Sequence, residues 1–406
     1  MKVLHVTPCY APAWEQGGPA WSVPNLCRSI AHLGHDVTVF TTNVNGAGRL
    51  KVPVGCDVWR DQVRVRYFPI TFGWPPRYNV SLRLAAALLS EVTCHDLVHI
   101  QGAMTFPSAV AGLLCRRRGI PYLVSPRGVL DREGFKKKAL RKRLYTRLVE
   151  RRNLAGAAAV HFATEEERRR CTHLPLMVPT IVVPNSLDFA EFDAPPTSGA
   201  FTTQYPETTG KRLILFLGRL SYNKGLDFLV RAFSLLARRR TDVHLVVVGP
   251  DPGGYAHRLR SWLAREGIAD RATFTGLLVG GEKLAVLRES DVLVLPSYHS
   301  ESFGLAAAEA MAARLPVVLS SKANLAPDVV AAGAGFAIDY DPHAWADALE
   351  ILLDRPDLAH SMGERGRSLV RERFDTAVVA RRMCSAYGEI LSRGGFATEP
   401  APEVSG

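Results

Sequence analysis

Residues 215–233 read LFLGRLSYNKGLDFLVRAF, which is an apolar strand, a glycine turn and then a helix. This order of strand, turn and helix repeats through the second half of the chain. Short strands that are apolar throughout and alternate with helices predict a parallel sheet covered on both faces. The strands expected in this half are Leu213–Leu217, Leu245–Val248, Thr273–Thr275, Val292–Leu295, Val317–Leu319 and Phe336–Ile338. The expected helices are Gly225–Arg239, Ala256–Glu266, Glu282–Glu289, Phe303–Ala313 and Pro342–Leu353.

The first half of the chain shows the same alternation. Its helical patterns include Ala20–Leu33 and Pro107–Arg118. The expected strands are Val3–Thr7, Val37–Thr41, Leu97–Ile100, Tyr122–Ser125, Ala158–Phe162 and Ile181–Val183. We therefore predict an α/β protein with two Rossmann-like, doubly wound parallel-sheet domains that face each other across a cleft. In such sheets, ligands bind beyond the carboxyl ends of the strands.

A change in composition marks the expected boundary between the domains. Residues 189–210, FAEFDAPPTSGAFTTQYPETTG, are rich in Pro, Thr, Ser and Gly and interrupt the alternation. We expect a first domain at 1–190, a linker at 191–210 and a second domain at 211–375. A C-terminal helix at 376–393 is expected to return to the first domain, followed by a disordered tail at 394–406.

Composition limits the class of protein. The chain has 406 residues, enough for two domains, and a formal net charge of +11, which favours an anionic partner. Its seven cysteines form no CxxC pair, so a reducing compartment is expected and a zinc site is not. No signal peptide and no apolar run of about 18 residues is present, which predicts a cytosolic protein.

The positive charge is concentrated in one segment. Residues 131–152, DREGFKKKALRKRLYTRLVERR, contain ten Lys or Arg and three acids. Leu140, Leu144 and Leu148 recur at helical spacing, which predicts a basic amphipathic helix. One interpretation is that 136–152 binds an anionic membrane surface, which would place the protein on the inner face of the cytoplasmic membrane. The other is an ordinary solvated helix face.

Two cations follow the strand of the opening stretch. Arg219 and Lys224 lie in the loop at the carboxyl end of that strand. A planar guanidinium and a mobile ammonium both suit phosphate oxygens. An isolated pair of this kind can equally be two solvent-facing cations, so the interpretation depends on the rest of the domain.

The stretch ESFGLAAAEAM, 301–311, supplies that context, because it follows the strand at Val292–Leu295 and opens a helix. The amides of Ser302, Phe303, Gly304 and Leu305 would be free to bind an anion, with Ser302 as the cap. Glu309 would lie about 9 Å up the helix from Phe303 and lean back toward its start. A carboxylate there can accept two hydrogen bonds from a diol such as ribose, and Glu301 can do the same for a hexose. A solvent-exposed helix glutamate is the simpler alternative for Glu309.

These stretches resemble a known family. GRLSYNKG at 218–225 and ESFGLAAAEAMAARLPVV at 301–318 look like the donor-site signatures of the family 4 retaining glycosyltransferases, which have the GT-B fold. The resemblance extends over nearly the whole chain, through the glycine-rich opening at 5–42 and IVVPNSLD at 181–188. The stretch 98–130 resembles a branch with many exopolysaccharide and O-antigen transferases.

The resemblance implies roles for single residues. Arg219 and Lys224 would hold the donor diphosphate, and Glu309 would bind the nucleotide ribose. Glu301, with the amides of residues 302–305, would hold the donor sugar and the distal phosphate. Gly17 and Gly18 would bring a loop of the first domain close to the diphosphate. The residues expected near the base are Pro250 and the segment from Gly276 to Val279.

The chain departs from the family pattern at three positions. Arg127 in SPRG stands where many relatives have a histidine, and a cation there would stabilise the leaving phosphate. The branch often shows His-x-His-Gly where this chain has His99-Ile-Gln101-Gly102, and His99 is either a contact of the acceptor or donor sugar or a hydrogen-bonded histidine at a strand end. Arg314 stands where relatives usually have glycine, in a turn with a structural role.

The resemblance implies transfer of a sugar from a UDP or GDP sugar to a saccharide or lipid-linked saccharide, in cell-surface polysaccharide biosynthesis such as that of lipopolysaccharide or exopolysaccharide. It also implies retention of configuration without a metal or other cofactor, since Arg and Lys neutralise the diphosphate. The sequence offers no clear nucleophile for double displacement, which favours front-face attack. A GT-B epimerase or hydrolase is the first alternative. A nucleic-acid-binding protein is more distant, because no such motif accompanies the charge. The oligomeric state stays open.

Overall fold

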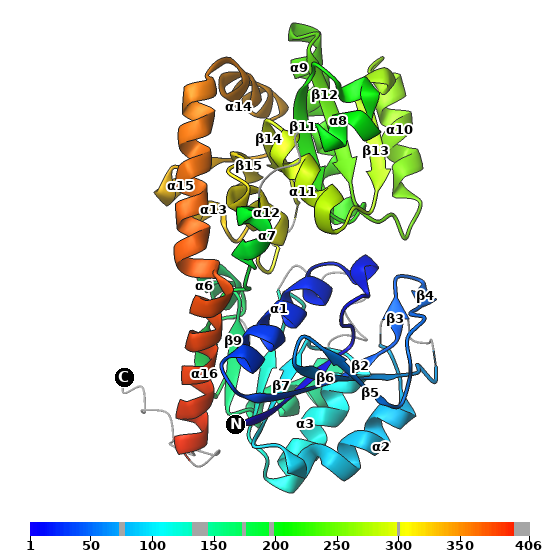
Figure 1. Ribbon diagram of the computed structural model, residues 1–406, viewed down its shortest axis with the longest axis vertical. Helices are drawn as coiled ribbons and strands as arrows, with labels where there is room; N and C mark the ends of the chain where they lie inside the picture. Colours follow the sequence, from blue (N-terminus) through cyan, green and yellow to red (C-terminus); the bar gives the residue numbers. More distant parts are fainter. Residues whose placement is uncertain (73–77, 132–144, 173–175, 195–198, 299–300, 394–406) are drawn as a thin grey trace. The chain divides into compact units, whose positions relative to one another are not determined.

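The computed structural model describes residues 1–72, 78–131, 145–172, 176–194, 199–298 and 301–393. The chain divides into two compact units. Unit 1 contains Met1–Ser186 and the segment from Thr376 onward, and unit 2 contains Leu187–Asp375. The chain therefore leaves unit 1 after Ser186 and re-enters it at Thr376, as the colours of Figure 1 show.

An eight-stranded sheet forms the centre of unit 1. The strand order is β10-β9-β8-β7-β1-β2-β6-β5, and every neighbouring pair is parallel except β5 and β6. The strands are β1 Lys2–Thr7, β2 Asp36–Thr42, β5 Asp57–Arg60, β6 Val63–Phe68, β7 Leu97–Gln101, β8 Tyr122–Ser125, β9 Ala159–Phe162 and β10 Thr180–Val182. The short strands β3 (Val44–Asn45) and β4 (Gly48–Arg49) pair separately.

Helices cover both faces of this sheet. Successive residues of a strand point to opposite faces, so neighbouring residues of β1 pack in different cores. Val3 of β1 packs in a core with α1 and α16, whereas Leu4 packs in a second core with α2 and α3. The helix α16 lies beside α1 (Figure 1). The helices of unit 1 are α1 Gly18–His32, α2 Leu82–Glu91, α3 Phe106–Arg118, α5 Arg151–Ala155, α6 Glu165–Arg170 and α16 Thr376–Ser392, with a π-helical turn at Thr146–Glu150 and 3-10 turns at Trp14–Gln16 and Val92–Cys94.

Unit 2 has a six-stranded sheet in which all neighbours are parallel, in the order β13-β12-β11-β14-β15-β16. The strands are β11 Arg212–Leu217, β12 Val243–Val248, β13 Ala272–Gly276, β14 Val292–Leu295, β15 Val317–Ser320 and β16 Gly335–Ile338. The order reverses direction between β11 and β14, and such a switch point is where doubly wound sheets bind ligands.

The helices of unit 2 are α7 Phe189–Asp193, α8 Ala200–Gln204, α9 Leu226–Arg239, α10 Tyr255–Arg265, α11 Gly280–Glu289, α12 Leu305–Ala312, α13 Ala326–Ala332, α14 Pro342–Asp354 and α15 Pro356–Phe374. Three 3-10 turns, at Pro206–Thr208, Tyr222–Lys224 and Ala269–Arg271, join them to the strands. The largest core of the unit packs α9, α10 and α14 against the sheet, with Trp345 fully buried.

The predicted fold class is confirmed: both halves are doubly wound α/β units. The structure adds β5 and β6, which the sequence analysis did not predict. The stretch expected as a linker at 191–210 contains α8, whose Phe201 is buried, and lies within unit 2. The helix expected at 376–393 is α16, and it belongs to unit 1. The tail at 394–406 lies outside the described residues.

The prediction for the start of α12 is wrong. The helix begins at Leu305, and its N-cap is Gly304 with φ of +91°, not Ser302. Glycine reaches this left-handed conformation without steric strain, so the chain turns sharply before the helix. In the described part of the chain, no helix is both long enough and apolar enough to cross a membrane.

Candidate active site

The switch point of unit 2 brings together the two charged loops singled out from the sequence. Lys224 lies in the turn after β11, and Glu301 lies in the loop after the neighbouring strand β14. Lys224 Nζ donates to Glu301 Oε1 in an ion pair, and Ser297 Oγ donates to the same oxygen at 2.6 Å. The backbone amide of Tyr298 bonds to Asn223 O at 3.0 Å, which ties the loops together.

The Glu301 carboxyl is ionised in this setting. Burial alone would raise its pKa, but the positive charge of Lys224 and the hydrogen bonds from Lys224 and Ser297 outweigh that effect and lower the pKa below its usual value. The side chain of Lys224 is 22% exposed and that of Glu301 is 15% exposed. The pair is therefore a preformed polar site that a ligand can still reach.

A glycine allows this close approach of the two loops. Gly225 has φ of +65°, and a Cβ at this position would lie 2.0 Å from Pro296 O. Any larger residue would push the loop after β11 away from the end of β14. Gly225 therefore keeps Lys224 next to Glu301.

The ends of β11, β12 and β13 carry three further predicted residues. The amide of Leu220, which follows Arg219, bonds to Pro250 O at 3.0 Å, and Gly249 N bonds to Gly276 O at 2.8 Å. These bonds bring the loops with Arg219, Pro250 and Gly276 to the same edge of the sheet.

The start of α12 offers backbone donors beside Glu301. The amides of Ala307 and Ala308 both bond to Gly304 O, so the amides of Leu305 and Ala306 are the donors at the opening of the helix. The Phe303 side chain is buried against Phe374, with ring centroids 4.9 Å apart. Ser302 O accepts from Asn324 Nδ2 at 3.3 Å.

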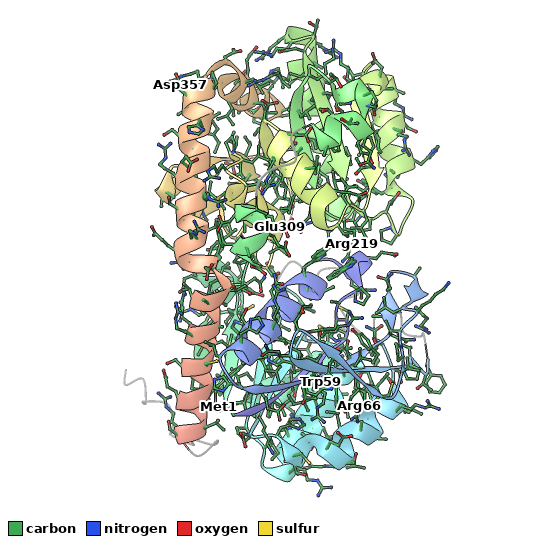
Figure 2. The ribbon with its side chains drawn as sticks, in the orientation of Figure 1. Met1, Trp59, Arg66, Arg219, Glu309 and Asp357 are labelled. Atoms are coloured by element: carbon green, nitrogen blue, oxygen red, sulfur yellow. The ribbon has the colours of Figure 1, made fainter. Side chains whose placement is uncertain are left out.

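Glu309 has a partner that the sequence analysis missed. It is 7% exposed, and its Oε1 accepts from Lys283 Nζ of α11 at 2.9 Å. Figure 2 places Glu309 and Arg219 at the same end of unit 2. A solvent-exposed helix glutamate, the simpler alternative, is therefore wrong.

Lys283 lies in α11 one turn after Val279, the residue before that helix. The positive charge of a lysine so near the start of a helix interacts unfavourably with the helix dipole. This unfavourable position is the feature of the sequence that could have singled out Lys283. The structure therefore pairs Lys283, near the start of α11, with Glu309 of α12.

In unit 1, His99 is inside the protein. It is fully buried, and its ring nitrogens pair with Tyr387 Oη at 2.6 Å and Ser125 Oγ at 2.7 Å. Burial and the nearby His5, His161 and Arg127 lower its pKa well below the usual value, so the ring is neutral. This fits the second alternative, a hydrogen-bonded histidine at a strand end, and His99 is left out of the proposed site.

Arg127 follows β8 with a left-handed φ of +57°. Its guanidinium donates twice to Gln101 Oε1, at 3.0 and 2.6 Å, and also to Asn185 Oδ1. Burial lowers its pKa from a very high ordinary value, which leaves the group cationic. The predicted cation is therefore held in a fixed position by neighbouring side chains.

Gly17 and Gly18 open α1 after β1. Gly17 has φ of +81° and ψ of −149°, and its amide bonds to Trp14 O at 3.1 Å. Gly18 is exposed, and a Cβ there would meet no atom within 4 Å. The positive φ of Gly17 therefore sets the path of the loop, whereas the space beside Gly18 is open.

Two family descriptions match most of the chain. Residues 200–369 match glycosyl transferases group 1, and residues 17–186 match the glycosyl transferase 4-like domain. A D-inositol 3-phosphate glycosyltransferase from Arthrobacter sp. (strain FB24) is 30% identical over 395 residues, which are 89% of this chain and 87% of that protein. The chain belongs to the glycosyltransferase family.

Other relatives of this chain match over a shorter length. The D-inositol 3-phosphate glycosyltransferase of Corynebacterium glutamicum (strain R) is 33% identical over 186 residues, 45% of this chain and 44% of that protein. The chain covers 44% to 50% of the length of three such relatives. Among solved structures, Anabaena Alr3699/HepE in complex with UDP-glucose has a TM-score of 0.76 and 18% identity, over 96% of this chain and 100% of that chain. The chain has the GT-B fold.

Two further findings concern possible metal ligands and the cysteines. Within the described residues, no group of three or more His, Cys, Asp or Glu side chains could hold a metal ion. All seven cysteines, each in the described part of the chain, are free thiols.

A buried carboxyl holds the loop that contains Arg127. Glu167 Oε1 accepts from the amide of Gly128 at 2.6 Å, and Oε2 accepts from the amide of Ala163 at 2.7 Å. Burial raises the pKa of Glu167 to about 7, although these two amides and the charge of Arg127 act in the opposite direction. Glu167 therefore changes charge near neutral pH.

Relative to Glu167→Gln, the wild type should lose stability as the pH rises from 5 to 8. The pKa is raised from 4.5 in the unfolded chain, so the folded state binds more protons in this window and stability falls with pH. The loss should be about 2 kcal/mol. Urea unfolding of both proteins at each pH measures it. Equal pH dependence in the two proteins would mean that Glu167 titrates with its ordinary pKa.

Proposed function

We propose that this chain transfers a sugar from a nucleotide-diphosphate donor to a hydroxyl of a saccharide, free or lipid-linked. The observation that carries the proposal is the ion pair of Lys224 with Glu301 at the switch point of unit 2, beside Arg219 and the start of α12. Cationic side chains and backbone amides bind the phosphate oxygens of such a donor, and a carboxylate accepts hydrogen bonds from the hydroxyl groups of its sugar. Membership in the family supports the same assignment.

In the proposed donor complex, Arg219 and Lys224 bind the diphosphate, and Glu301 with the amides of Ser302 through Leu305 binds the sugar. Glu309 binds the ribose, and Pro250, Gly276 and Val279 lie near the base. In unit 1, Gly17, Gly18 and Arg127 are further proposed phosphate contacts. The Lys224–Glu301 pair supports this assignment, since one site then holds both charge types that a diphosphate sugar requires.

The proposed reaction is a front-face substitution at C1 of the donor sugar. The bond between C1 and the diphosphate oxygen breaks, and a bond from C1 to the acceptor oxygen forms on the same face. The acceptor proton passes to the departing diphosphate. Arg219 and Lys224 stabilise the negative charge that develops on that leaving group, the role that a metal ion has in other transferases.

The test is calorimetry with a panel of UDP and GDP sugars in the presence of EDTA, followed by product analysis with saccharide acceptors. We expect one or two donors to bind and the product to retain the anomeric configuration, seen by NMR. The acceptor panel should include inositol phosphate, since the curated relatives are inositol phosphate glycosyltransferases. Donor turnover without any acceptor would favour an epimerase or hydrolase. Absence of donor binding and of nucleotide release would contradict the proposal.

We propose the cell-surface polysaccharide pathways of the resembling branch as the setting, with the protein in the cytosol and held on the membrane. The basic segment at 136–152 would bind anionic lipid. Residues 132–144 lie outside the described part of the chain, whereas Arg147, Leu148, Arg151 and Arg152 are described and exposed. Exposed cations around an exposed leucine support this interpretation.

Changing Lys136, Lys137, Lys138, Arg141 and Lys142 to Glu should reduce binding to vesicles with anionic lipid by at least tenfold. Each basic residue near such a surface contributes about 1 kcal/mol to binding, so reversal of five charges is more than enough for a tenfold loss. Vesicle sedimentation measures the change, with neutral vesicles and high salt as controls. Unaltered binding would remove this segment from the proposal.

A further inference from the structure

Three aromatic rings gather in unit 1 where β7 leads into α3. The ring of Tyr78 contacts those of Phe106 and Tyr145 edge to face, with centroids 6.1 and 5.7 Å apart. The amide of Phe106 also bonds to Tyr78 O at 2.8 Å, which fixes the first pair. All three residues are half-buried, so part of each remains at the surface. Phe106 begins α3 just beyond the carboxyl end of β7, the kind of position where such sheets bind ligands.

The turn that follows Tyr145 is unusual. Thr146–Glu150 is a single π-helical turn, a rare conformation that is frequent at functional sites. Among the described residues, Thr146 Oγ1 and Glu150 Oε1 are buried without a hydrogen-bond partner. Native proteins leave few buried polar atoms unpaired, because each one lacks the hydrogen bonds that water would give it. Two on one turn indicate that a ligand completes them.

Neighbouring groups meet the polar atoms of this turn only in part. The other oxygen of Glu150 accepts from the amide of Met104 at 2.9 Å, and Met104 is held at a left-handed φ of +58°. Asn153, one turn further on, donates to Ser108 O at 3.3 Å. Asn153 and Arg116 lie close enough to lower the pKa of Glu150, but its Oε1 has no partner within hydrogen-bond geometry. Strain of this kind is usual at binding sites.

We propose that Tyr78, Tyr145, Thr146 and Glu150 form the subsite for a sugar ring of the acceptor. The inference rests on the proposed transferase function and adds to it the place where the acceptor is recognised. It lies in unit 1, separate from the donor residues of unit 2.

The chemistry of the cluster fits a neutral sugar. The apolar face of a pyranose packs on aromatic rings, and its hydroxyl groups both donate and accept hydrogen bonds. A hydroxyl can therefore pair with Thr146 Oγ1 and with Glu150 Oε1. Burial raises the pKa of Glu150, and a sugar hydroxyl pairs with the carboxyl in either protonation state. A buried carboxyl disfavours a phosphate at the same position, because two negative charges repel each other.

The sharpest test is Thr146→Val, which removes an unpartnered hydroxyl and keeps the shape of the side chain. If the hydroxyl serves only the fold, its loss changes nothing in catalysis. We expect the acceptor KM to rise about tenfold, the equivalent of one hydrogen bond, with kcat, donor affinity and Tm unchanged. The matched control is Tyr255→Phe in unit 2, which also removes a buried unpartnered hydroxyl and should leave the acceptor KM unchanged.

Tyr145→Leu is the second variant, and it removes a ring of the cluster. We expect it to raise the acceptor KM at least tenfold while donor binding by calorimetry stays at the wild-type value. Saturation-transfer NMR with methyl hexopyranosides gives a direct readout, in which signals of the wild type should vanish in both variants. A wild-type acceptor KM in both Thr146→Val and Tyr145→Leu would overturn the proposal.

The wild-type enzyme separates this inference from the proposed function. Transfer by the wild type with no effect of either variant would overturn the subsite alone. Failure of the wild type to bind any donor or to release nucleotide would overturn the transferase function, and with it the subsite. Equal increases in KM for a free saccharide and for its lipid-linked form would place recognition in the sugar ring. An increase for the lipid-linked form only would overturn a sugar subsite and indicate a lipid contact.

Discussion

Glu309→Ala is expected to abolish detectable donor binding and to lower the free energy of unfolding by about 3–5 kcal/mol. The stability loss follows from the buried ion pair with Lys283 Nζ. The side chain of Lys283 is only 7% exposed and that of Glu309 only 9%. Removal of the carboxylate leaves a buried cation without its main counter-ion. The binding loss follows from the proposed hydrogen bonds between Glu309 and the ribose.

These two effects can be separated with a double variant. Replacement of a buried ion pair by apolar side chains of similar volume is often neutral for stability. We therefore expect Lys283→Met with Glu309→Leu to recover most of the lost stability but none of the donor binding. Chemical unfolding and calorimetry with the preferred donor measure the two quantities.

Recovery of both stability and donor binding in the double variant would contradict the ribose role, and Glu309 would then be a structural residue. Lys283→Met alone is the complementary control, because it leaves the carboxylate in place without its cation. We expect that variant to be destabilised as well, and to bind the donor more weakly because Glu309 is no longer held in position.

The sheets could be predicted from the sequence because their strands are short, continuous apolar runs between helical patterns. All twelve predicted strands occur, with ends that shift by at most two residues, the largest shift being at the start of β12. The strands β5 and β6 were missed because Val63 and Val65 alternate with Arg64 and Arg66, and only one face of the hairpin is apolar. Parallel strands buried on both faces give the stronger signal.

The site was predicted less completely, because its contacts join elements that are distant in sequence. Lys224 and Glu301 were singled out for their loops, but only the neighbouring strands β11 and β14 show that the two side chains pair. The bond between Lys283 and Glu309 joins α11 to α12, and no local pattern encodes it. Arg314 has φ of +64°, a left-handed conformation that suits glycine, so the arginine side chain needs support from the rest of the turn.

Lys224→Met is expected to lower kcat by about 10²–10³-fold, the effect of removing one group that stabilises developing negative charge. Donor affinity should fall less, because Arg219 and the amides at the start of α12 remain. The matched control is Lys211→Met, the same substitution at an exposed lysine of unit 2, and it should behave as wild type. Initial rates at saturating donor and acceptor measure the effect.

The pH dependence of stability in Lys224→Met tests the structural part of the role of Lys224, which is its pairing with Glu301. In the wild type, burial opposes ionisation of Glu301, but Lys224 keeps its pKa below the usual value. Stability from this pair is present above the unfolded pKa of Glu301 and is lost as the pH falls through the folded one. Without Lys224, burial raises that pKa, so the variant should be destabilised at pH 7 and approach wild-type stability near pH 4.

The decisive comparison is with Glu301→Gln, which removes the carboxylate charge and keeps its shape. In the double variant Lys224→Met with Glu301→Gln, the unpaired buried charge is gone and the stability at pH 7 should recover. If the double variant has the kcat of Glu301→Gln alone, Lys224 acts only by neutralising Glu301, and its role on the diphosphate is wrong. If its kcat stays 10²-fold or more below that of Glu301→Gln while stability recovers, Lys224 acts on the leaving group itself.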